Sequence, residues 1–329
     1  MSIEGEIWSE IVTPTAALKA KRHPLNRLVW LAVDQGSQRH ILVSTTSSEA
    51  GMALLQTKAV RATTRELRIA SENAMVWIDI ESLDPSQHEA FSSLAFDLAS
   101  RIETGSDAFT SALQVLQSWK AFWEAEKSSL SLQQEAGLFA ELWFIRHWMG
   151  MTAPIDSWTG PEMAIHDFRW PNTAVEVKAT LSRSDGFPTH RISSLDQLDD
   201  VADADLYLFS MQLASDPESV LSVESLVTEI EQMLGQQQLA RADFRRRLTF
   251  TGYREGSLTG ASFRVLTERL YQVEPGFPRL TRSSFSVPLP SGVDDVNYAL
   301  DLAACSDWLK ASAPSGFAAG RLAPTQDAG

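Results

Sequence analysis

The sequence predicts an α/β fold in which a mixed central sheet is flanked by helices and follows a mainly β N-terminal part. Runs of β-branched and aromatic residues, separated by turn residues, dominate the first 85 residues. Apolar residues then recur at helical spacing over 88–102 and 109–126. Beyond residue 130, helical and extended stretches follow one another, which is typical of a sheet covered by helices.

Residues 1–125 are expected to form a small sheet with two covering helices. Its strands are predicted at four places: 28–33, 40–45, 60–69 and 74–80. The segment Asp34-Gln-Gly-Ser-Gln between the first two is a turn signal and indicates a hairpin. This region contains no grouping of side chains that indicates catalysis.

Residues 126–310 are expected to form a second part, with a C-terminal elaboration, that shares packing with the first. Its elements are predicted in this order: helix 131–149, strands 164–170 and 173–180, a polar loop at 182–194, a short helix, strand 205–213, helices 219–234 and 236–247, strands 249–253, 262–273 and 282–287, and a strand or helix within 296–309. Residues 311–329 are rich in Ala, Ser, Pro and Gly, which predicts a disordered tail.

The composition excludes several classes of protein. Of the 329 residues, 44% are hydrophobic and 21% are charged, as in ordinary globular proteins. No apolar run approaches 18 residues, so no membrane-spanning helix is expected. The acidic N-terminus lacks the pattern of a secretory signal. The single cysteine, Cys305, excludes an intrachain disulfide and a cysteine-based zinc cluster. We expect a reduced, cytoplasmic protein.

The charge of the chain is unevenly distributed. The net charge of −14 argues against a protein that binds nucleic acid over its whole surface. Residues 241–290, however, contain nine arginines and only four acidic residues. Two interpretations are open: this segment forms one basic face, or its arginines belong to ordinary solvated helices and strands.

The segment from Asp167 to Lys178 carries the clearest chemical signal. Pro171-Asn172 supplies a turn between two extended pieces. Strand alternation then divides the second piece into a polar face (Glu176, Lys178, Thr180) and an apolar face (Val175, Val177, Ala179). An acid and a base on a largely buried strand are costly unless they are neutralised or used.

A bound metal would explain this arrangement. Asp167 and Glu176 could supply carboxylate oxygens to Mg²⁺, and the Val177 carbonyl could add a third ligand. Lys178 could then position or deprotonate the attacking water, or stabilise charge on a phosphate. Phosphodiester hydrolysis needs both functions. The alternative is an ordinary ion pair between Glu176 and Lys178 on a half-exposed sheet.

The helix before this segment strengthens the hypothesis. Ser131 and Gln134 fit a capping box at its start. Glu141 is the only charged residue between Ala136 and Ile145, and it lies on a face expected to be buried. A metal site near Lys178 would give this carboxylate a partner. The alternative is a helix-edge charge paired with Arg146 or another arginine.

These residues resemble the PD-(D/E)XK nuclease superfamily, which has the restriction-endonuclease-like fold. The resemblance lies in Glu141 on its helix, followed by Asp167 and by Glu176-Val-Lys178. The segments 137–142, 176–180 and 190–198 are similar to those of a bacterial group of PD-(D/E)XK proteins. The resemblance is specific over about 131–200. One departure is His166, where many members of the superfamily have proline before the aspartate.

The resemblance implies a role for each matching residue. Asp167 and Glu176 would be the metal ligands, Lys178 the catalytic lysine, and Glu141 an auxiliary acid. Thr180 and Gln197 would support these residues or face the DNA.

In a nuclease, the polar loop after the lysine strand would contact backbone phosphates through Arg183, His190 and Arg191. The alternative is a solvated loop. The cluster Arg245-Arg246-Arg247 would lie along DNA or dock a partner protein.

The function implied by the resemblance is Mg²⁺-dependent hydrolysis of DNA phosphodiesters, with Mn²⁺ as a substitute. The cellular role would be that of the nuclease component of a bacterial restriction or anti-phage defence system. Expected partners are DNA, a second copy in a homodimer, or an ATPase or helicase that recruits this acidic chain to DNA, whereas no membrane is expected. Two alternatives are a non-catalytic scaffold or DNA-docking module within a larger complex, and an RNA-cleaving enzyme with the same site.

Overall fold

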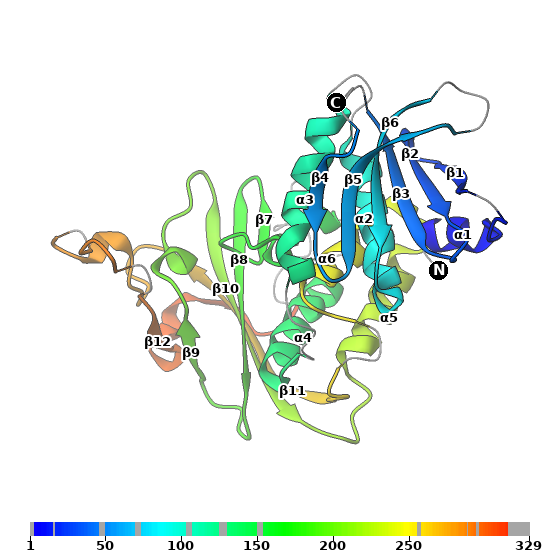
Figure 1. Cartoon of the computed structure of the whole chain (residues 1–329). Helices are drawn as coiled ribbons and strands as arrows, with labels where there is room; N and C mark the ends of the chain where they lie inside the picture. The colour runs from blue at the N-terminus through cyan, green and yellow to red at the C-terminus, as the bar shows by residue number, and fades with distance from the viewer. Residues whose placement is uncertain are drawn as a thin grey trace, which may run out of the picture. The chain divides into compact units, whose positions relative to one another are not determined.

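The computed structural model describes the chain in ten ranges: 3–15, 17–45, 50–69, 74–102, 107–124, 130–149, 154–254, 258–287, 289–293 and 296–314. The chain divides into two compact units, and most of their helices and strands are labelled in Figure 1. The N-terminal unit is Met1–Ser128 with Arg241–Phe250, and the C-terminal unit is Ser129–Ala240 with Thr251–Gly329. The expected α/β fold class, with a mixed sheet, flanking helices and a mainly β N-terminal part, is confirmed.

The N-terminal unit is built on a six-stranded antiparallel sheet. In spatial order its strands are β1 (Lys19–His23), β2 (Asn26–Val33), β3 (Arg39–Ser44), β6 (Met75–Ser82), β5 (Val60–Leu67) and β4 (Ala53–Gln56). Four of them match the predicted strands. The edge strands β1 and β4 were not predicted, because β1 is the charged string Lys-Ala-Lys-Arg-His and β4 has only four residues. Neither shows a clear apolar alternation.

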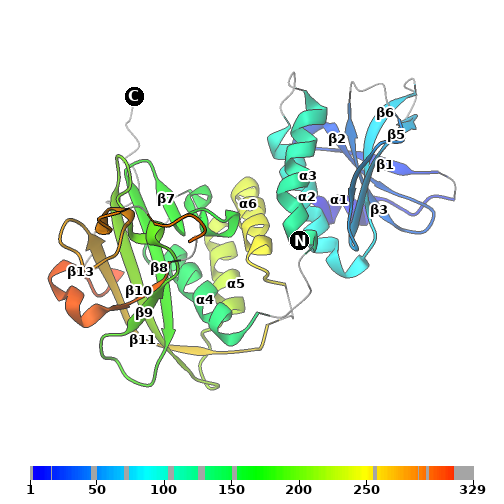
Figure 2. The ribbon, with the colours of Figure 1, turned by 60° about the vertical axis from the view of Figure 1, so that its left-hand side comes forward.

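Helices cover one face of this sheet and form its main core (Figure 2). They are α1 (Ile3–Glu10), α2 (His88–Arg101), which follows the 3₁₀ turn η1 (Pro85–Gln87), and α3 (Ala108–Glu124). The last ten residues of α6 (Gln238–Phe250) belong to the same unit and contact α2 and α3 rather than the sheet. Ile78 and Ile80 of β6 belong to this core together with Phe91 of α2 and Trp119 of α3. Phe250 of α6 packs on Trp119, with ring centroids 4.6 Å apart. A segment far along the chain therefore completes the N-terminal core.

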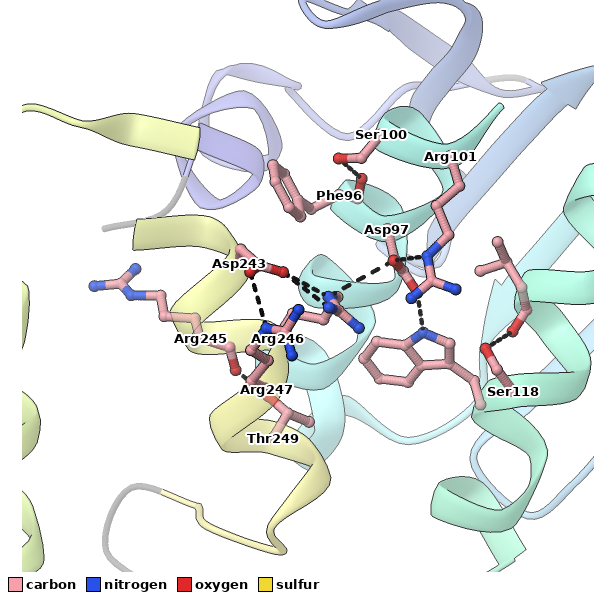
Figure 3. Close-up of polar contacts among 12 residues, drawn as sticks. Phe96, Asp97, Ser100, Arg101, Ser118, Asp243, Arg245, Arg246, Arg247 and Thr249 are labelled. Carbon is pink, nitrogen blue, oxygen red and sulfur yellow. Dashed lines mark hydrogen bonds and ion pairs between the residues drawn. The ribbon is translucent and has the colours of Figure 1, made fainter. Parts of the chain in front are cut away.

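Ion pairs within the N-terminal unit hold α6 in place (Figure 3). The Arg246 guanidinium lies 2.8 Å from Asp243 Oδ1 and 3.7 Å from Asp97 Oδ1. Arg247 Nε lies 2.9 Å from the other Asp243 oxygen, and both arginines are buried. The prediction that Arg246 and Arg247 lie along DNA is therefore wrong, because their charges are neutralised inside the unit. Arg245 is half-buried and points away from this pair.

The C-terminal unit is built on a mixed five-stranded sheet. In spatial order its strands are β13 (Leu309–Ala311), β11 (Phe263–Val273), β10 (Asp205–Ser215), β8 (Thr173–Leu181) and β7 (Phe168–Trp170). Strands β8 and β10 are parallel, and the other neighbours are antiparallel. A separate pair joins β9 (Thr189–Ile192) to β12 (Tyr298–Asp301). Short 3₁₀ turns connect the strands: η2 (Ile155–Ser157), η3 (Gly160–Glu162), η4 (Leu195–Leu198), η5 (Arg282–Ser284) and η6 (Leu302–Trp308).

Both faces of this sheet are covered. On one face lies α4 (Leu132–His147), with α5 (Val223–Leu234) beside it (Figure 2). Phe144 of α4 packs on Phe168 and Phe209, with ring centroids 4.8 Å and 5.0 Å apart. On the other face, a second apolar cluster includes Leu208 and Tyr271. Polar side chains of β8 are therefore enclosed rather than displayed on an open sheet.

Some predicted elements differ from the observed ones. The predicted strand at 249–253 is wrong, because α6 continues to Phe250 and a turn follows. The predicted strand at 282–287 is also wrong, because Thr281 and Ser284 form a capping box that begins the 3₁₀ turn η5. The second part was expected to begin at residue 126 and to include α6, whereas residues 241–250 belong to the N-terminal unit. Of the predicted tail, 315–329 lie outside the described residues.

None of the helices in the described ranges combines the length and the apolar character that crossing a bilayer requires.

Candidate active site

Asp167 stands at the entrance to the β7–β8 hairpin. The turn at Pro171-Asn172 pairs Trp170 with Thr173 and Phe168 with Val175. Asp167 directly precedes β7, so its side chain lies next to the following part of β8. Its Oδ2 accepts a hydrogen bond from the Val177 backbone N–H at 2.7 Å. The turn signal in the sequence thus brings the aspartate beside the strand that carries the acid and the lysine.

The Val177 carbonyl faces the same side as Asp167. In a strand, the N–H and C=O of one residue point to the same edge. The Val177 N–H points to Asp167, and the described pairing of β7 with β8 extends only to Val175. The carbonyl of Ala179, two residues further on, points to this edge as well and accepts a hydrogen bond from Gln133 of α4 at 3.3 Å. A backbone oxygen is therefore available beside the Asp167 carboxylate.

Glu176 and Lys178 project from the same face of β8, the face that carries Leu208 and Tyr271 on the neighbouring strands. Lys178 Nζ lies 2.6 Å from Glu176 Oε1 and 3.2 Å from Gln197 Oε1 in η4. The same Gln197 oxygen accepts the Ser193 backbone N–H at 2.8 Å, which fixes the amide. The Glu176 side chain is 2% exposed and that of Lys178 is 16% exposed. An ordinary ion pair on a half-exposed sheet does not describe this arrangement.

Glu141 enters the site from α4. The capping box of Ser131 and Gln134 begins this helix as predicted. Glu141 Oε2 accepts a hydrogen bond from the indole N–H of Trp158 at 2.7 Å. Arg146, the alternative partner considered for Glu141, instead binds Glu229, with 3.0 Å between its Nε and the carboxylate.

Gly160 lies between the Asp167 and Glu141 carboxylates. The backbone N–H groups of Thr159 and Gly160 both donate to the Asp167 carbonyl, at 2.8 Å and 3.0 Å. A Cβ on Gly160 would lie 2.8 Å from Asp167 Oδ1 and 3.4 Å from Glu141 Oε2. The sequence did not predict a role for Gly160 or Trp158. Gly160-Pro161 indicates a turn but no role in a reaction, and no sequence pattern distinguishes Trp158 from the other nine tryptophans.

The site accumulates negative charge away from water. Burial, and then the neighbouring Asp167, raise the pKa of Glu176 to about 8 despite the nearby Lys178 ammonium. Burial raises the pKa of Asp167 to about 6, against the opposing effect of the Val177 N–H. Burial and the Asp167 carboxylate also raise the pKa of Glu141 well above its ordinary value. One lysine does not balance three carboxylates, so the site favours a further cation.

The oxygen donors present fit a divalent cation. Glu176 Oε2 is buried and finds no hydrogen-bond partner in the part of the chain that the structure describes. Carboxylate and carbonyl oxygens are the ligands that Mg²⁺ prefers, together with waters. Among the described residues, no three His, Cys, Asp or Glu side chains stand in a metal-binding geometry. The predicted ligand set of two carboxylates and the Val177 carbonyl does not require a third such side chain.

His190 lies inside the protein rather than on its loop surface. Its Nε2 lies 2.7 Å from Ser210 Oγ, and its Nδ1 lies 3.4 Å from Thr180 Oγ1. Burial, and then the charge of Lys178, lower the pKa of His190 to about 4, so the ring is neutral. The prediction that His190 contacts phosphate is therefore wrong, since the side chain is enclosed. Thr180 is half-buried behind the lysine, whereas Arg183 and Arg191 are exposed.

The fold and this group of residues define a PD-(D/E)XK nuclease-like protein. Helix-borne Glu141, Asp167 before the hairpin, and Glu176 with Lys178 on a central strand stand together as the resemblance implied. The chain belongs to the family described as "Putative PD-(D/E)XK family member, (DUF4420)", whose model matches residues 5–303. The family resemblance is confirmed, and it covers nearly the whole chain. Comparison with curated proteins and with solved structures found no match.

Proposed function

We propose that this protein is a metal-dependent nuclease that hydrolyses phosphodiester bonds of DNA. The observation that carries the proposal is the convergence of Asp167, Glu176 and Lys178 within one enclosed site, with Glu141 beside them. Membership of a PD-(D/E)XK family supports the same conclusion.

Asp167, the free Glu176 oxygen and the Val177 carbonyl would hold the cation, Mg²⁺ or Mn²⁺. When bound, the cation would neutralise charge on the phosphate and favour ionisation of a water molecule. The hydrogen bond from Val177 N–H orients the Asp167 carboxylate, and Gly160 leaves room for it. Trp158 holds Glu141 at the edge of the same group as an auxiliary acid.

Lys178 would act on the reacting phosphate or on the attacking water. Glu176 and Gln197 hold its ammonium from two sides, so little reorganisation is needed when substrate binds.

The substrate and its delivery belong to the same proposal. Arg183 and Arg191 are exposed and would contact backbone phosphates. The net charge of −14 opposes unassisted approach to DNA, which supports recruitment by an ATPase or helicase, or a second copy, in a bacterial defence system.

Metal binding without substrate or partner is the first test. Mn²⁺ is titrated calorimetrically into the wild type, an Asp167→Ala, Glu176→Ala double variant, and Glu229→Ala. Glu229 is a matched control, because it is an ion-paired carboxylate of the same unit that does not belong to the site. We expect binding by the wild type and the control alone. Absence of wild-type binding up to millimolar Mn²⁺ would favour the non-catalytic scaffold.

Cleavage by the Lys178→Ala variant completes the test. The variant should retain Mn²⁺ binding and lose hydrolysis of double- and single-stranded DNA. Cleavage at the wild-type rate would remove Lys178 from the mechanism. An RNA panel with 2′-deoxy substitutions separates DNA from RNA as substrate.

A further inference from the structure

The loop Ser182–Pro188, which follows the lysine strand β8, is held by hydrogen bonds from side chains of β10 and β11. Gln212 of β10 donates from Nε2 to the Ser184 carbonyl at 3.3 Å. Arg269 of β11 donates to the carbonyls of Asp185 and Gly186, each at 3.0 Å. Side chains of the sheet thus hold three consecutive backbone carbonyls, and the loop has a defined conformation.

The loop held in this way exposes the aromatic ring of Phe187 to solvent. The Arg269 guanidinium lies 4.6 Å from the ring centroid of Phe187, and Phe187 remains 47% exposed. Arg269 is itself fixed, because it also donates to Gln212 Oε1 at 3.1 Å and to Thr267 Oγ1 at 3.2 Å. A half-exposed ring that the guanidinium already holds can take a flat ligand on its open side with little loss of side-chain entropy.

The register of the sheet places Arg269, which holds this ring, two strands from the proposed catalytic lysine. Lys178 pairs with Ser210 of β10, and Ser210 pairs with Arg269 of β11. Arg269 therefore stands two strands from Lys178 on the same face, at a Cα separation of about 10 Å.

We propose that Phe187 is a stacking platform for an unpaired base of the nucleic-acid strand that occupies the site. The inference rests on the proposed function. Aromatic rings bind unpaired bases without regard to sequence, and a ring held in advance loses little entropy on binding. Arg183 in the same loop is exposed and would contact the backbone phosphate next to the stacked base. Arg269 is a positioning residue, because its Nη1 and Nη2 atoms donate to the loop and the sheet.

Two oligomers of equal charge test the platform in the full-length protein. Fluorescence anisotropy measures binding of a labelled 20-mer of thymidine and a 20-mer of abasic deoxyribose phosphate, with Ca²⁺ replacing Mg²⁺. The wild type should bind the base-bearing oligomer about tenfold more tightly. Phe187→Leu should bind both oligomers equally, and Phe187→Trp should retain the preference. Phe285→Leu, which alters another exposed phenylalanine of the same unit, should also retain it.

Several results would overturn the platform. They are an unchanged preference in Phe187→Leu, equal binding of both oligomers by the wild type, or no binding at all. Mn²⁺ titration distinguishes this failure from failure of the proposed function, because Phe187→Leu should bind Mn²⁺ as the wild type does. A uridine 20-mer shows whether the base is delivered on DNA or RNA. Binding of a protein partner lost in Phe187→Leu, with oligomer preference intact, would assign the ring to that partner instead.

Discussion

Replacing Gly160 with alanine tests the geometry of the site without removing any charge. The new Cβ would lie 2.8 Å from Asp167 Oδ1 and 3.2 Å from Asp167 Cα, closer than ordinary contacts. Asp167 must then shift by about half an ångström, which strains its hydrogen bond from Val177 N–H. Overpacking of this kind costs about 1–3 kcal/mol. We expect a loss of about 2 kcal/mol in unfolding free energy and at least about tenfold weaker Mn²⁺ binding.

Gly137→Ala is the matched control. Gly137 lies within α4, and a Cβ there would meet no atom within 4 Å among the described residues. Alanine is favoured over glycine in a helix interior, so this variant should gain about 0.5–1 kcal/mol. Urea unfolding and Mn²⁺ calorimetry measure both quantities. Wild-type stability together with wild-type Mn²⁺ affinity in Gly160→Ala would refute the close approach of Gly160 to Asp167.

Three further predictions concern stability and pH. Asp97→Ala should cost about 3–5 kcal/mol, because it leaves buried Arg246 and the Trp119 indole N–H without this carboxylate. Met163→Gly should stabilise the protein by about 0.5–1 kcal/mol, since Met163 has φ 60° and a side chain that is 90% exposed. In EDTA, unfolding free energy should fall by about 1–2 kcal/mol from pH 6.5 to 8, because unfolded Glu176 ionises near 4.5 and the folded form only near a pKa of about 8.

Each of these predictions has its own control. Arg101→Ala removes a half-exposed partner of Asp97 and should cost less than about 1 kcal/mol, so an equal loss in both variants would contradict the argument. Met163→Ala keeps the Cβ and should bring no gain; a destabilised Met163→Gly would show that the side chain has a structural contact. Glu176→Gln should reduce the fall in unfolding free energy and leave the smaller part that the raised pKa values of Glu141 and Asp167 contribute, and a flat wild-type profile in EDTA would contradict the prediction.

Local sequence signals predicted the parts of the site that depend on neighbouring residues. The capping box fixed the start of α4, and the turn at Pro171-Asn172 fixed the β7–β8 hairpin. Strand alternation correctly placed Glu176 and Lys178 on one face, because the period of a strand is a property of its backbone. Together with the position of Glu141 on its helix, these signals account for the four central residues.

The remaining features depend on contacts between distant segments. Gly160 matters because its backbone lies so close to Asp167 that a side chain would not fit there. Trp158 matters because its indole N–H reaches Glu141. Neither property is visible in a single sequence. The arginines of α6 illustrate the same limit. A cluster of three charges suggests a surface, and only the positions of Asp97 and Asp243 show that two of them are inside.

The assignment of 241–250 to the N-terminal unit has a consequence for biosynthesis. The ribosome has made about three quarters of the chain before Phe250 is available to cover Trp119. Part of the core between the N-terminal sheet and its first three helices therefore stays exposed while residues 129–240 of the C-terminal unit are synthesised. A fragment ending at residue 128 would lack both this cover and the charge that balances Asp97. Separate production of the two units therefore requires a graft of α6 onto the first unit rather than a cut between them.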